Sequence, residues 1–137
     1  MTIDEVLPSQ AYVMMQQDPA IFFIDVRTEF EFNFIGYPVG AENLPYLDDN
    51  FIPRGDAFLR DIRELTLTDG THSKEPPIMM LICRSGDRSY QAAKYLKENG
   101  FCCVINVKHG FEGDRNDEHH RSSVNGWRFE NLPWAQF

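Results

Sequence analysis

The sequence predicts an α/β fold, in which helices cover both faces of a small parallel sheet. Three runs of strand length, residues 20–24, 78–82 and 102–107, are apolar or nearly so without alternation. Such runs are typical of strands that are buried on both faces of a parallel sheet. Segments with helical periodicity separate the runs, and strands that alternate with helices favour a parallel sheet.

The first half of the chain contains two predicted helices, one on either side of the first strand. Residues 8–17 present an apolar face at helical spacing, and Pro19 is expected to stop that helix just before the strand 20–24. Thr28 is a suitable N-cap for a short helix over residues 29–34, because a glutamate three residues later completes a capping box.

The second half repeats the pattern with longer elements. Apolar residues recur at helical spacing over residues 56–65, and a polar connection that ends in proline follows over residues 66–77. After the strand 78–82, residues 89–97 carry a stripe of small and apolar side chains and end at an Asn-Gly pair, as helices commonly do. The strand 102–107 completes the predicted sheet.

The C-terminal part of the chain lacks this periodicity. Residues 110–126 combine acids, bases and two adjacent histidines with few apolar side chains, which indicates a long surface excursion near the rim of the site. The aromatic side chains of residues 126–134 are expected to pack back onto the body of the protein. Without an internal repeat, low-complexity segment or linker, residues 1–137 are predicted to form one domain.

The composition limits the classes of function. Among 137 residues, 13 lysines and arginines stand against 21 aspartates and glutamates, for a formal net charge of −8. This balance argues against general nucleic-acid binding. No apolar run has transmembrane length, and the N-terminus is acidic where a signal peptide is basic. Three cysteines, an odd number, do not make a disulfide framework, so we expect no membrane association and a reducing, cytoplasmic setting.

The strongest candidate for a reactive site is the stretch Cys83-Arg84-Ser85-Gly86-Asp87-Arg88-Ser89. It joins an apolar strand to a helix start, where loop N–H groups and the helix N-terminus converge and favour negative charge. Two arginines within five residues of the sulfur add positive charge, an environment typical of a nucleophilic cysteine. Cys102 and Cys103 lie in an apolar run and are expected to be small buried hydrophobes.

Two other strand ends are expected at the same rim, because the carboxyl ends of parallel strands meet at one edge of the sheet. Asp25 and Arg27 follow the first strand and are expected to form a structural pair beneath the loop. His109 follows the last strand, where it is either a proton donor at the rim or a turn residue without a chemical role.

Three motifs resemble those of single-domain rhodanese-like sulfurtransferases, the thiosulfate sulfurtransferase family. They are Asp25-Val26-Arg27-Thr28-x-x-Glu31-Phe32, Gly40-Ala41-x-Asn43-Leu44-Pro45 and the Cys83 loop. The order of the predicted elements agrees as well, so the resemblance covers nearly the whole chain. It implies a rhodanese-like fold without a cofactor or metal. It also implies that Cys83 takes a sulfane sulfur from thiosulfate or a related persulfide donor and passes it to a thiophilic acceptor, such as a thiol, cyanide or a protein.

In that interpretation the substrate-binding site consists of Arg84, Ser85, Gly86, Asp87, Arg88 and Ser89, supported by Asp25, Arg27 and His109. Thiosulfate is a dianion that Arg84 and Arg88 can bind by charge-assisted hydrogen bonds. Loop N–H groups and serine hydroxyls would stabilise the terminal sulfur of the persulfide. Asp87 is expected to point outward or to pair with a loop arginine.

The chain departs from the family pattern in two places. The turn of residues 36–41 has Tyr37-Pro38 where the family has a histidine. The family's ending is split, because the insertion over residues 110–126 precedes Trp127. The insertion follows a strand that ends at the site, so we expect it to cover the loop and to select the acceptor. A similar Gly-Trp-x-x-x-x-Leu-Pro-Trp ending occurs mainly in bacterial single-domain members.

The residues leave alternatives open. A persulfide carrier with little turnover would use the same loop. A cysteine-dependent phosphatase or arsenate reductase needs an arginine six positions after the cysteine, where this chain has Ser89 and a smaller anion loop. A metal site at His109, His119 and His120 is disfavoured, because adjacent histidines seldom bind one ion and no Cys-x-x-Cys or His-x-x-x-His spacing is present.

Overall fold

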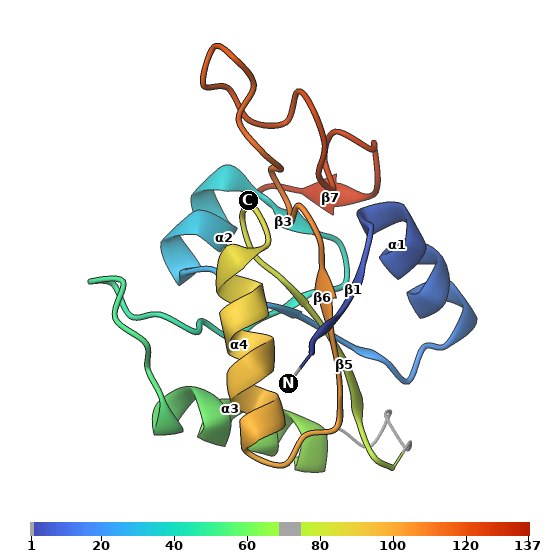
Figure 1. Cartoon of the computed structure of the whole chain (residues 1–137), viewed down its shortest axis with the longest axis vertical. Helices are drawn as coiled ribbons and strands as arrows, with labels where there is room; N and C mark the ends of the chain where they lie inside the picture. The colour runs from blue at the N-terminus through green and yellow to red at the C-terminus, as the bar shows by residue number, and fades with distance from the viewer. Residues whose placement is uncertain (1, 69–74) are drawn as a thin grey trace.

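The central sheet consists of parallel strands in the order β1-β6-β5-β2-β4 (Figure 1). This computed structural model describes residues 2–68 and 75–137, so the predicted connection over residues 66–77 lies partly outside the described residues. The strands are β1 (Asp4–Val6), β2 (Phe22–Asp25), β4 (Glu42–Asn43), β5 (Ile78–Ile82) and β6 (Cys103–Val107). Every neighbouring pair in this sheet is parallel, which confirms the predicted sheet type.

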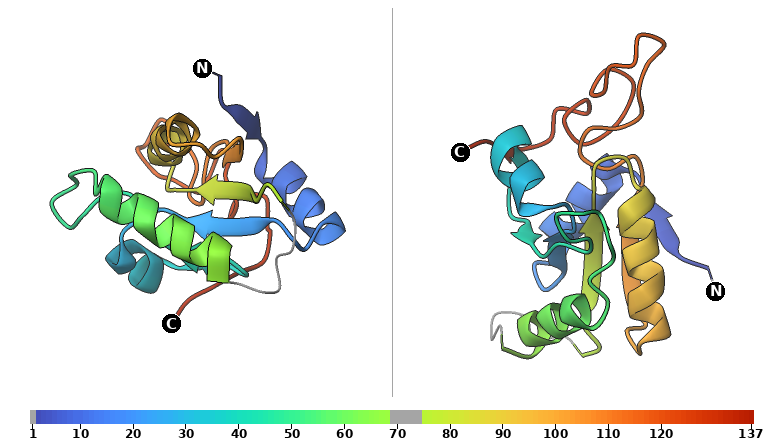
Figure 2. Two further views of the ribbon diagram at one scale, coloured as in Figure 1. Left: turned by 90° about the horizontal axis from the view of Figure 1, so that it is seen from below. Right: turned by 90° about the vertical axis from the view of Figure 1, so that its left-hand side faces the viewer.

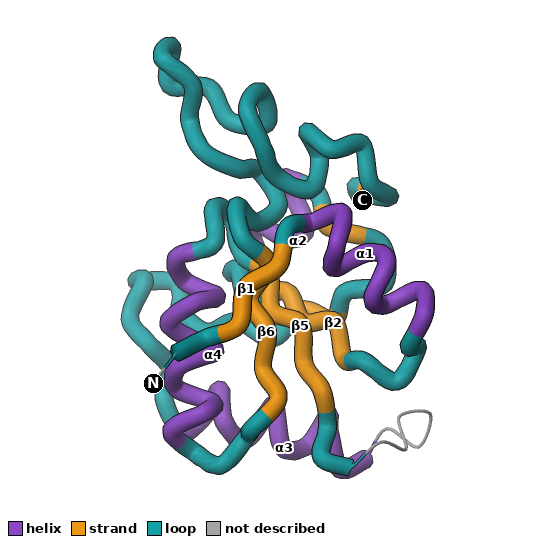
Figure 3. Tube along the Cα trace, turned by 45° about the vertical axis from the view of Figure 1, so that its right-hand side comes forward, coloured by secondary structure: helices purple, strands orange, loops and turns teal. Residues whose placement is uncertain are grey.

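Helices cover both faces of the sheet, as the sequence predicts (Figures 1 and 3). Helix α1 (Pro8–Gln17) packs on one face, and α3 (Asp56–Thr68) and α4 (Asp87–Glu98) pack on the other. Alternate residues of β2 and β5 point to opposite faces, so each uninterrupted apolar run contributes to both cores. The buried residues toward α3 and α4 are Phe22, Ile24, Met79 and Leu81, and those toward α1 are Phe23, Met80 and Ile82.

The segments that follow β2 and β5 shape the carboxyl edge of the sheet. Helix α2 (Glu29–Ile35) begins after the predicted cap Thr28, whose hydroxyl accepts the Glu31 N–H at 3.2 Å. The Glu31 carboxylate accepts the Thr28 N–H in return, also at 3.2 Å. Helix α4 begins at Asp87, two residues before its predicted start, because Gly86 takes the left-handed conformation (φ 103°) that closes the loop.

Strand β1 is absent from the sequence-based prediction. It is three residues long and begins with two exposed acidic residues, so it has no apolar run that would reveal it. Its place is set by pairing with β6, in the register Asp4↔Ile105 and Val6↔Val107. A short, charged strand is a common way to end a sheet edge without inviting further pairing.

Of the C-terminal aromatic residues that were expected to dock on the body of the protein, Trp127 is buried as predicted, whereas Phe129 and Trp134 are 50% and 39% exposed. Trp127 is buried against Phe23, with ring centroids 5.3 Å apart, and donates its indole N–H to the Pro133 carbonyl at 2.8 Å. Strand β7 (Trp134–Ala135) then pairs antiparallel with β3 (Tyr37–Pro38). The chain between β6 and β7, orange to red in Figure 2, projects beyond the carboxyl edge of the sheet. No helix among the described residues is both long and apolar enough to cross a membrane.

Candidate active site

Cys83 directly follows β5, at the carboxyl edge of the sheet and beside the start of α4 (Figure 1). Its Sγ accepts hydrogen bonds from the Gly86 N–H at 3.1 Å and from the Ser89 hydroxyl at 3.2 Å. Ser89 is buried, and its side chain reaches the sulfur from the first turn of α4. Two donors aimed at one sulfur stabilise negative charge on it. The residue itself is 0% exposed, so the sulfur lies beneath the protein surface.

The backbone of the loop is held from the side of β6. The carbonyl oxygen of Gly86 accepts a hydrogen bond at 3.1 Å from the Asn106 amide, which also donates to Glu5 Oε2 at 2.8 Å. Asn106 is fully buried, and these two bonds give its amide nitrogen partners inside the sheet, whereas its Oδ1 has no hydrogen-bond partner among the described residues. They fix the N-terminal end of α4, from which Ser89 reaches the sulfur.

The chain after β6 packs directly on the backbone of Cys83 and Arg84. The Cys83 carbonyl accepts the Phe111 N–H at 2.7 Å, and the Arg84 carbonyl accepts the Glu112 N–H at 2.9 Å. Gly110 makes this approach possible, because it has φ 66° and a Cβ there would lie 2.7 Å from the Arg84 carbonyl oxygen and closer still to that of Cys83. The start of the excursion is therefore part of the wall that shapes the loop.

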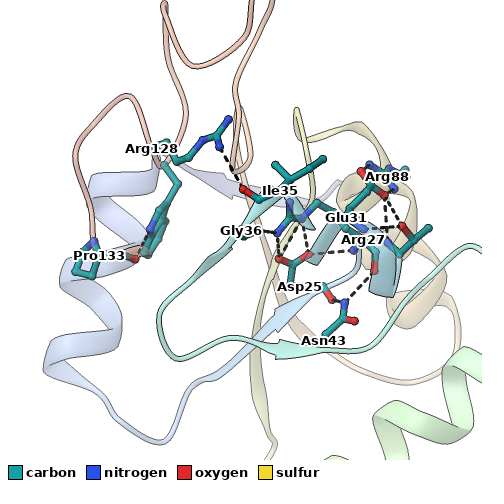
Figure 4. Close-up of polar contacts among 11 residues, drawn as sticks. Asp25, Arg27, Glu31, Ile35, Gly36, Asn43, Arg88, Arg128 and Pro133 are labelled. Carbon is teal, nitrogen blue, oxygen red and sulfur yellow. Dashed lines mark hydrogen bonds and ion pairs between the residues drawn. The ribbon is translucent and has the colours of Figure 1, made fainter. Parts of the chain in front are cut away.

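Arg88 forms a bidentate ion pair with Glu31 of α2, at 2.6 Å and 2.7 Å (Figure 4). Burial would raise the pKa of the Glu31 carboxyl, but the hydrogen bonds and charge of Arg88, together with Thr28, lower it to about 2. Burial would lower the pKa of Arg88, and Glu31 raises it above its usual value. Both terminal nitrogens of Arg88 contact Glu31 and so tie α2 to α4, while substrate binding by Arg88 stays a prediction.

Asp25 and Arg27 form the expected pair, completely buried at the end of β2 (Figure 4). The Arg27 Nη2 lies 2.7 Å from Asp25 Oδ2 and 2.7 Å from the Gly36 carbonyl oxygen. Its guanidinium also lies over the Phe111 ring, 4.6 Å from the centroid. Because Phe111 is hydrogen-bonded to the Cys83 carbonyl, this pair supports the loop from below through Phe111.

The outward side of the loop carries the remaining predicted residues. Arg84 and Asp87 are exposed, and Ser85 is half-buried. Arg121 of the excursion lies nearby, with its Nη1 2.7 Å from the Gly113 carbonyl oxygen. Burial and the charges of Arg84 and Arg115 lower the pKa of Arg121. Arg121 of the excursion is thus affected by the charge of Arg84 in the Cys83 loop, although nothing in the sequence indicated that Arg121 belongs to the site.

A hollow of about 460 Å³ adjoins the first turn of α4. Aromatic side chains of Tyr46, Phe51 and Tyr90 line it together with Asp87 and Arg88. It is large enough for a small organic molecule or for one side chain of a protein partner.

His109 lies at the rim, as predicted from its place after β6. Its Nδ1 is 3.6 Å from Asp114 Oδ2, and its backbone has φ 71°. Its amide nitrogen lies close to Gly86, 3.1 Å from where a Cβ on that glycine would be. The described residues include no group of three or more His, Cys, Asp or Glu side chains that could hold a metal ion.

Two residues of the site, Glu31 and Asn106, were not assigned to it from the sequence, although the sequence around each contains a relevant signal. Glu31 belongs to the first motif, but the sequence suggests only its capping role and not its contact with Arg88 across 57 positions. Asn106 is a single polar residue in an otherwise apolar strand, a pattern that often marks a buried hydrogen-bonding group. The expectation for Cys102 was wrong, because its side chain is exposed and not buried.

Comparison with known proteins connects this geometry to a family. Residues 7–117 match the sequence model of the rhodanese-like domain. The chain is similar to the uncharacterized protein RP600 of Rickettsia prowazekii, with 31% identity over 140 residues and 98% of each chain covered. It is also 31% identical to thiosulfate sulfurtransferase GlpE of Glaesserella parasuis, over 82% of this chain and 86% of that protein. The crystal structure of Rv0390 from M. tuberculosis shares 31% identity, with a TM-score of 0.84 and full coverage of both chains.

Proposed function

Because this chain belongs to the rhodanese-like domain family, we propose that it is a thiosulfate sulfurtransferase that carries sulfane sulfur as a persulfide on Cys83. The observation that carries the proposal is the pair of donors at the sulfur, the Gly86 N–H at 3.1 Å and the Ser89 hydroxyl at 3.2 Å. A terminal sulfur added to Cys83 brings negative charge into this cradle, where backbone and hydroxyl donors stabilise it.

The proposed reaction has two half-reactions. In the first, the Cys83 thiolate attacks the outer sulfur of thiosulfate, the S–S bond of the donor breaks, and sulfite leaves with the bonding electron pair. In the second, a thiophilic acceptor attacks the terminal sulfur of the persulfide, and the thiolate returns. With cyanide as the acceptor, the product is thiocyanate. No external oxidant or reductant is needed, because the sulfane sulfur moves between nucleophiles.

The arginines have different roles in this proposal. Arg84 is exposed at the loop, and Arg121 approaches from the excursion, so together they attract an anionic donor toward a protein whose net charge is −8. Arg88 is a positioning residue, because its nitrogens hold Glu31 and so fix the first turn of α4. Charge attraction and loop geometry are thereby assigned to separate residues.

The proposed donor rests on a similarity and the proposed acceptor on a hollow at the rim. Similarity to a protein named thiosulfate sulfurtransferase supports thiosulfate as the donor. The hollow beside Asp87 and Tyr90 is the proposed place for an acceptor thiol, either a small molecule or a protein side chain. The three cysteines are free thiols, which supports a reducing setting and hence our proposal of a cytoplasmic protein. We propose neither a nucleic acid nor a membrane as a binding partner.

An intact-mass measurement tests the first half-reaction. After thiosulfate treatment, the protein is expected to gain one sulfur atom, and cyanide is expected to remove it. The Cys83→Ser variant should gain no sulfur while keeping its far-UV circular dichroism. A sulfur gain that persists in this variant, or no gain in the wild type with any sulfane donor, would overturn the proposal.

Burial of Cys83 favours a second candidate, a persulfide carrier with little turnover. A sulfur that is 0% exposed is shielded from free acceptors, whereas a docking partner protein can open the loop. Steady-state thiocyanate formation separates the two functions, because a carrier forms the persulfide fully but turns over slowly with cyanide. A phosphatase or arsenate reductase is disfavoured, since position 89 holds a buried serine on the sulfur and not an arginine.

A further inference from the structure

A second thiol centre lies at the opposite edge of the sheet from Cys83. Cys102 is the last residue of the connection from α4, and Cys103 is the first residue of β6, at the amino ends of the strands (Figure 1). Their sulfurs are 3.4 Å apart, the Cys102 side chain is exposed, and Cys103 is partly exposed. The length of β6 alone separates this pair from the catalytic edge by about 13 Å, at roughly 3.3 Å per residue. The pair therefore lies outside the sulfur-transfer site.

An ordinary disulfide does not suit this pair. Adjacent residues joined by a trans peptide have Cα atoms about 3.8 Å apart, whereas disulfides usually need about 4.4–6.8 Å. In the described residues the one cis peptide bond is Glu75–Pro76, so the bond between the two cysteines is trans. The structure therefore favours two thiols that remain reduced and face the same point.

The distance between the two sulfurs indicates the bond angle at an atom that could bridge them. With thiolate bonds of about 2.3 Å, as for zinc, a spacing of 3.4 Å corresponds to an angle of about 95° at the bridging atom. A linear two-coordinate ion would need sulfurs about 4.6 Å apart, and a tetrahedral ion about 3.8 Å. The spacing thus fits a pyramidal centre with bond angles close to a right angle.

The surroundings supply no further ligand. Among residues 2–68 and 75–137, no group of three or more His, Cys, Asp or Glu side chains is placed to hold a metal ion. A structural zinc site needs four protein ligands, so this pair does not meet its requirement. The pair suits instead a thiophilic atom that forms three bonds, two of them to the cysteine sulfurs and the third to a substituent that it already carries.

We propose that Cys102 and Cys103 form a bidentate binding site for trivalent arsenicals. With an aryl arsenoxide, two As–S bonds form, the As=O oxygen leaves as water with the two thiol protons, and arsenic remains trivalent. No redox partner is required. The hydrogen bond with Cys102, assisted by burial, raises the pKa of Cys103 above its usual value. This does not oppose binding, because the reaction starts from protonated thiols and releases no net charge.

Phenylarsine oxide is the probe that tests this site. The full-length protein is first reduced and freed of reductant, then mixed with one equivalent of the probe and measured by intact mass. We expect one phenylarsenic group per chain, which resists excess monothiol and is removed by a 1,2-dithiol. A second bond formed within the same site raises affinity about 10²–10⁴-fold, so each single-cysteine variant should bind at least ~100-fold more weakly.

Three matched variants locate the binding. Cys102→Ser and Cys103→Ser should each lose the monothiol-resistant adduct, and Cys83→Ser should keep it. Circular dichroism checks that each variant is folded. A monothiol-resistant adduct that survives in either Cys102→Ser or Cys103→Ser, or that disappears in Cys83→Ser, would overturn the assignment. An unmodified wild-type mass would overturn it as well. None of these results depends on thiosulfate chemistry, so the site can be tested whether or not the proposed function holds.

Discussion

Replacing Glu31 by glutamine tests how strongly the active-site region depends on the ion pair between α2 and α4. The substitution keeps the size of the side chain but removes the charge that Arg88 contacts at 2.6 Å and 2.7 Å. The pair links two segments 57 positions apart, and its side chains are only 17% and 11% exposed. Loss of the charge leaves a partly buried guanidinium without a counter-charge, which is the costly way to break such a pair.

The pKa of Glu31 sets the size of the effect. Its fall from 4.5 to about 2 corresponds to roughly 3 kcal/mol of folding free energy, at 1.36 kcal/mol per pH unit. Residual solvent exposure reduces this to about 2–3 kcal/mol. The pKa is lower in the folded protein than in the unfolded chain. The stabilisation is therefore complete above about pH 4.5 and is lost as the pH falls toward 2.

Urea unfolding at a series of pH values measures both consequences. At pH 7, Glu31→Gln should lower the free energy of unfolding by about 2–3 kcal/mol. Between pH 4.5 and 2 the difference from the wild type should shrink, because the wild type loses there what the variant already lacks. Asp61→Asn is the matched control, since its pair with Arg54 is more exposed, at 26% and 32%, and should cost about 0–1 kcal/mol.

A double-mutant cycle gives the decisive result. If Glu31 and Arg88 act as one unit, Glu31→Gln combined with Arg88→Met should be clearly less destabilising than the sum of the two single changes. Additive effects, or a loss for Glu31→Gln no larger than for Asp61→Asn, would refute the argument that this pair ties α2 to α4.

Two further predictions concern anion binding and loop packing. Arg84→Ala and Arg121→Ala should each raise KM for thiosulfate several-fold at low salt, with little change in kcat. The control Arg60→Ala, on the exposed side of α3, should leave KM unchanged. If steady-state kinetics give equal KM values for all three variants and the wild type, neither Arg84 nor Arg121 helps to bind the donor. Gly110→Ala should be more destabilising than Gly40→Ala by roughly 1–3 kcal/mol. Both glycines have positive φ, but a Cβ at Gly40 meets nothing within 4 Å, while one at Gly110 collides with the backbone of Cys83 and Arg84. Equal melting temperatures would contradict this packing argument.

The proposed donor is an anion, so binding it to an acidic protein requires a local region of positive potential. The net charge is −8, and Arg121 of the excursion is affected by the positive charges of Arg84 and Arg115 as well as by the negative charges of Glu112 and Asp114. The excursion contributes two of these three arginines. Its proposed role is therefore wider than covering the loop, because it also helps to create the positive potential that draws the donor.

Local signals in the sequence were sufficient for much of the fold and for the position of the Cys83 loop at the end of β5. The apolar runs located β2, β5 and β6, because strands covered on both faces need no polar side. The pairing of Thr28 with a glutamate three residues later located the start of α2. The position of Cys83 between a strand and a helix identified the loop. Each of these inferences depends on neighbours within a few residues, which a sequence displays directly.

Only the tertiary structure decided the contacts between distant segments. Strand β1 exists because β6 pairs with it about a hundred positions away, and its own residues carry no strand signal. Arg88 contacts Glu31, and Arg121 approaches Arg84, through the packing of α2 and the excursion against the loop. Cys102 is exposed because α4 ends and β6 begins at the surface, although the surrounding run is apolar. Side-chain partners and exposure at such sites depend on how whole elements pack, and local periodicity does not encode that.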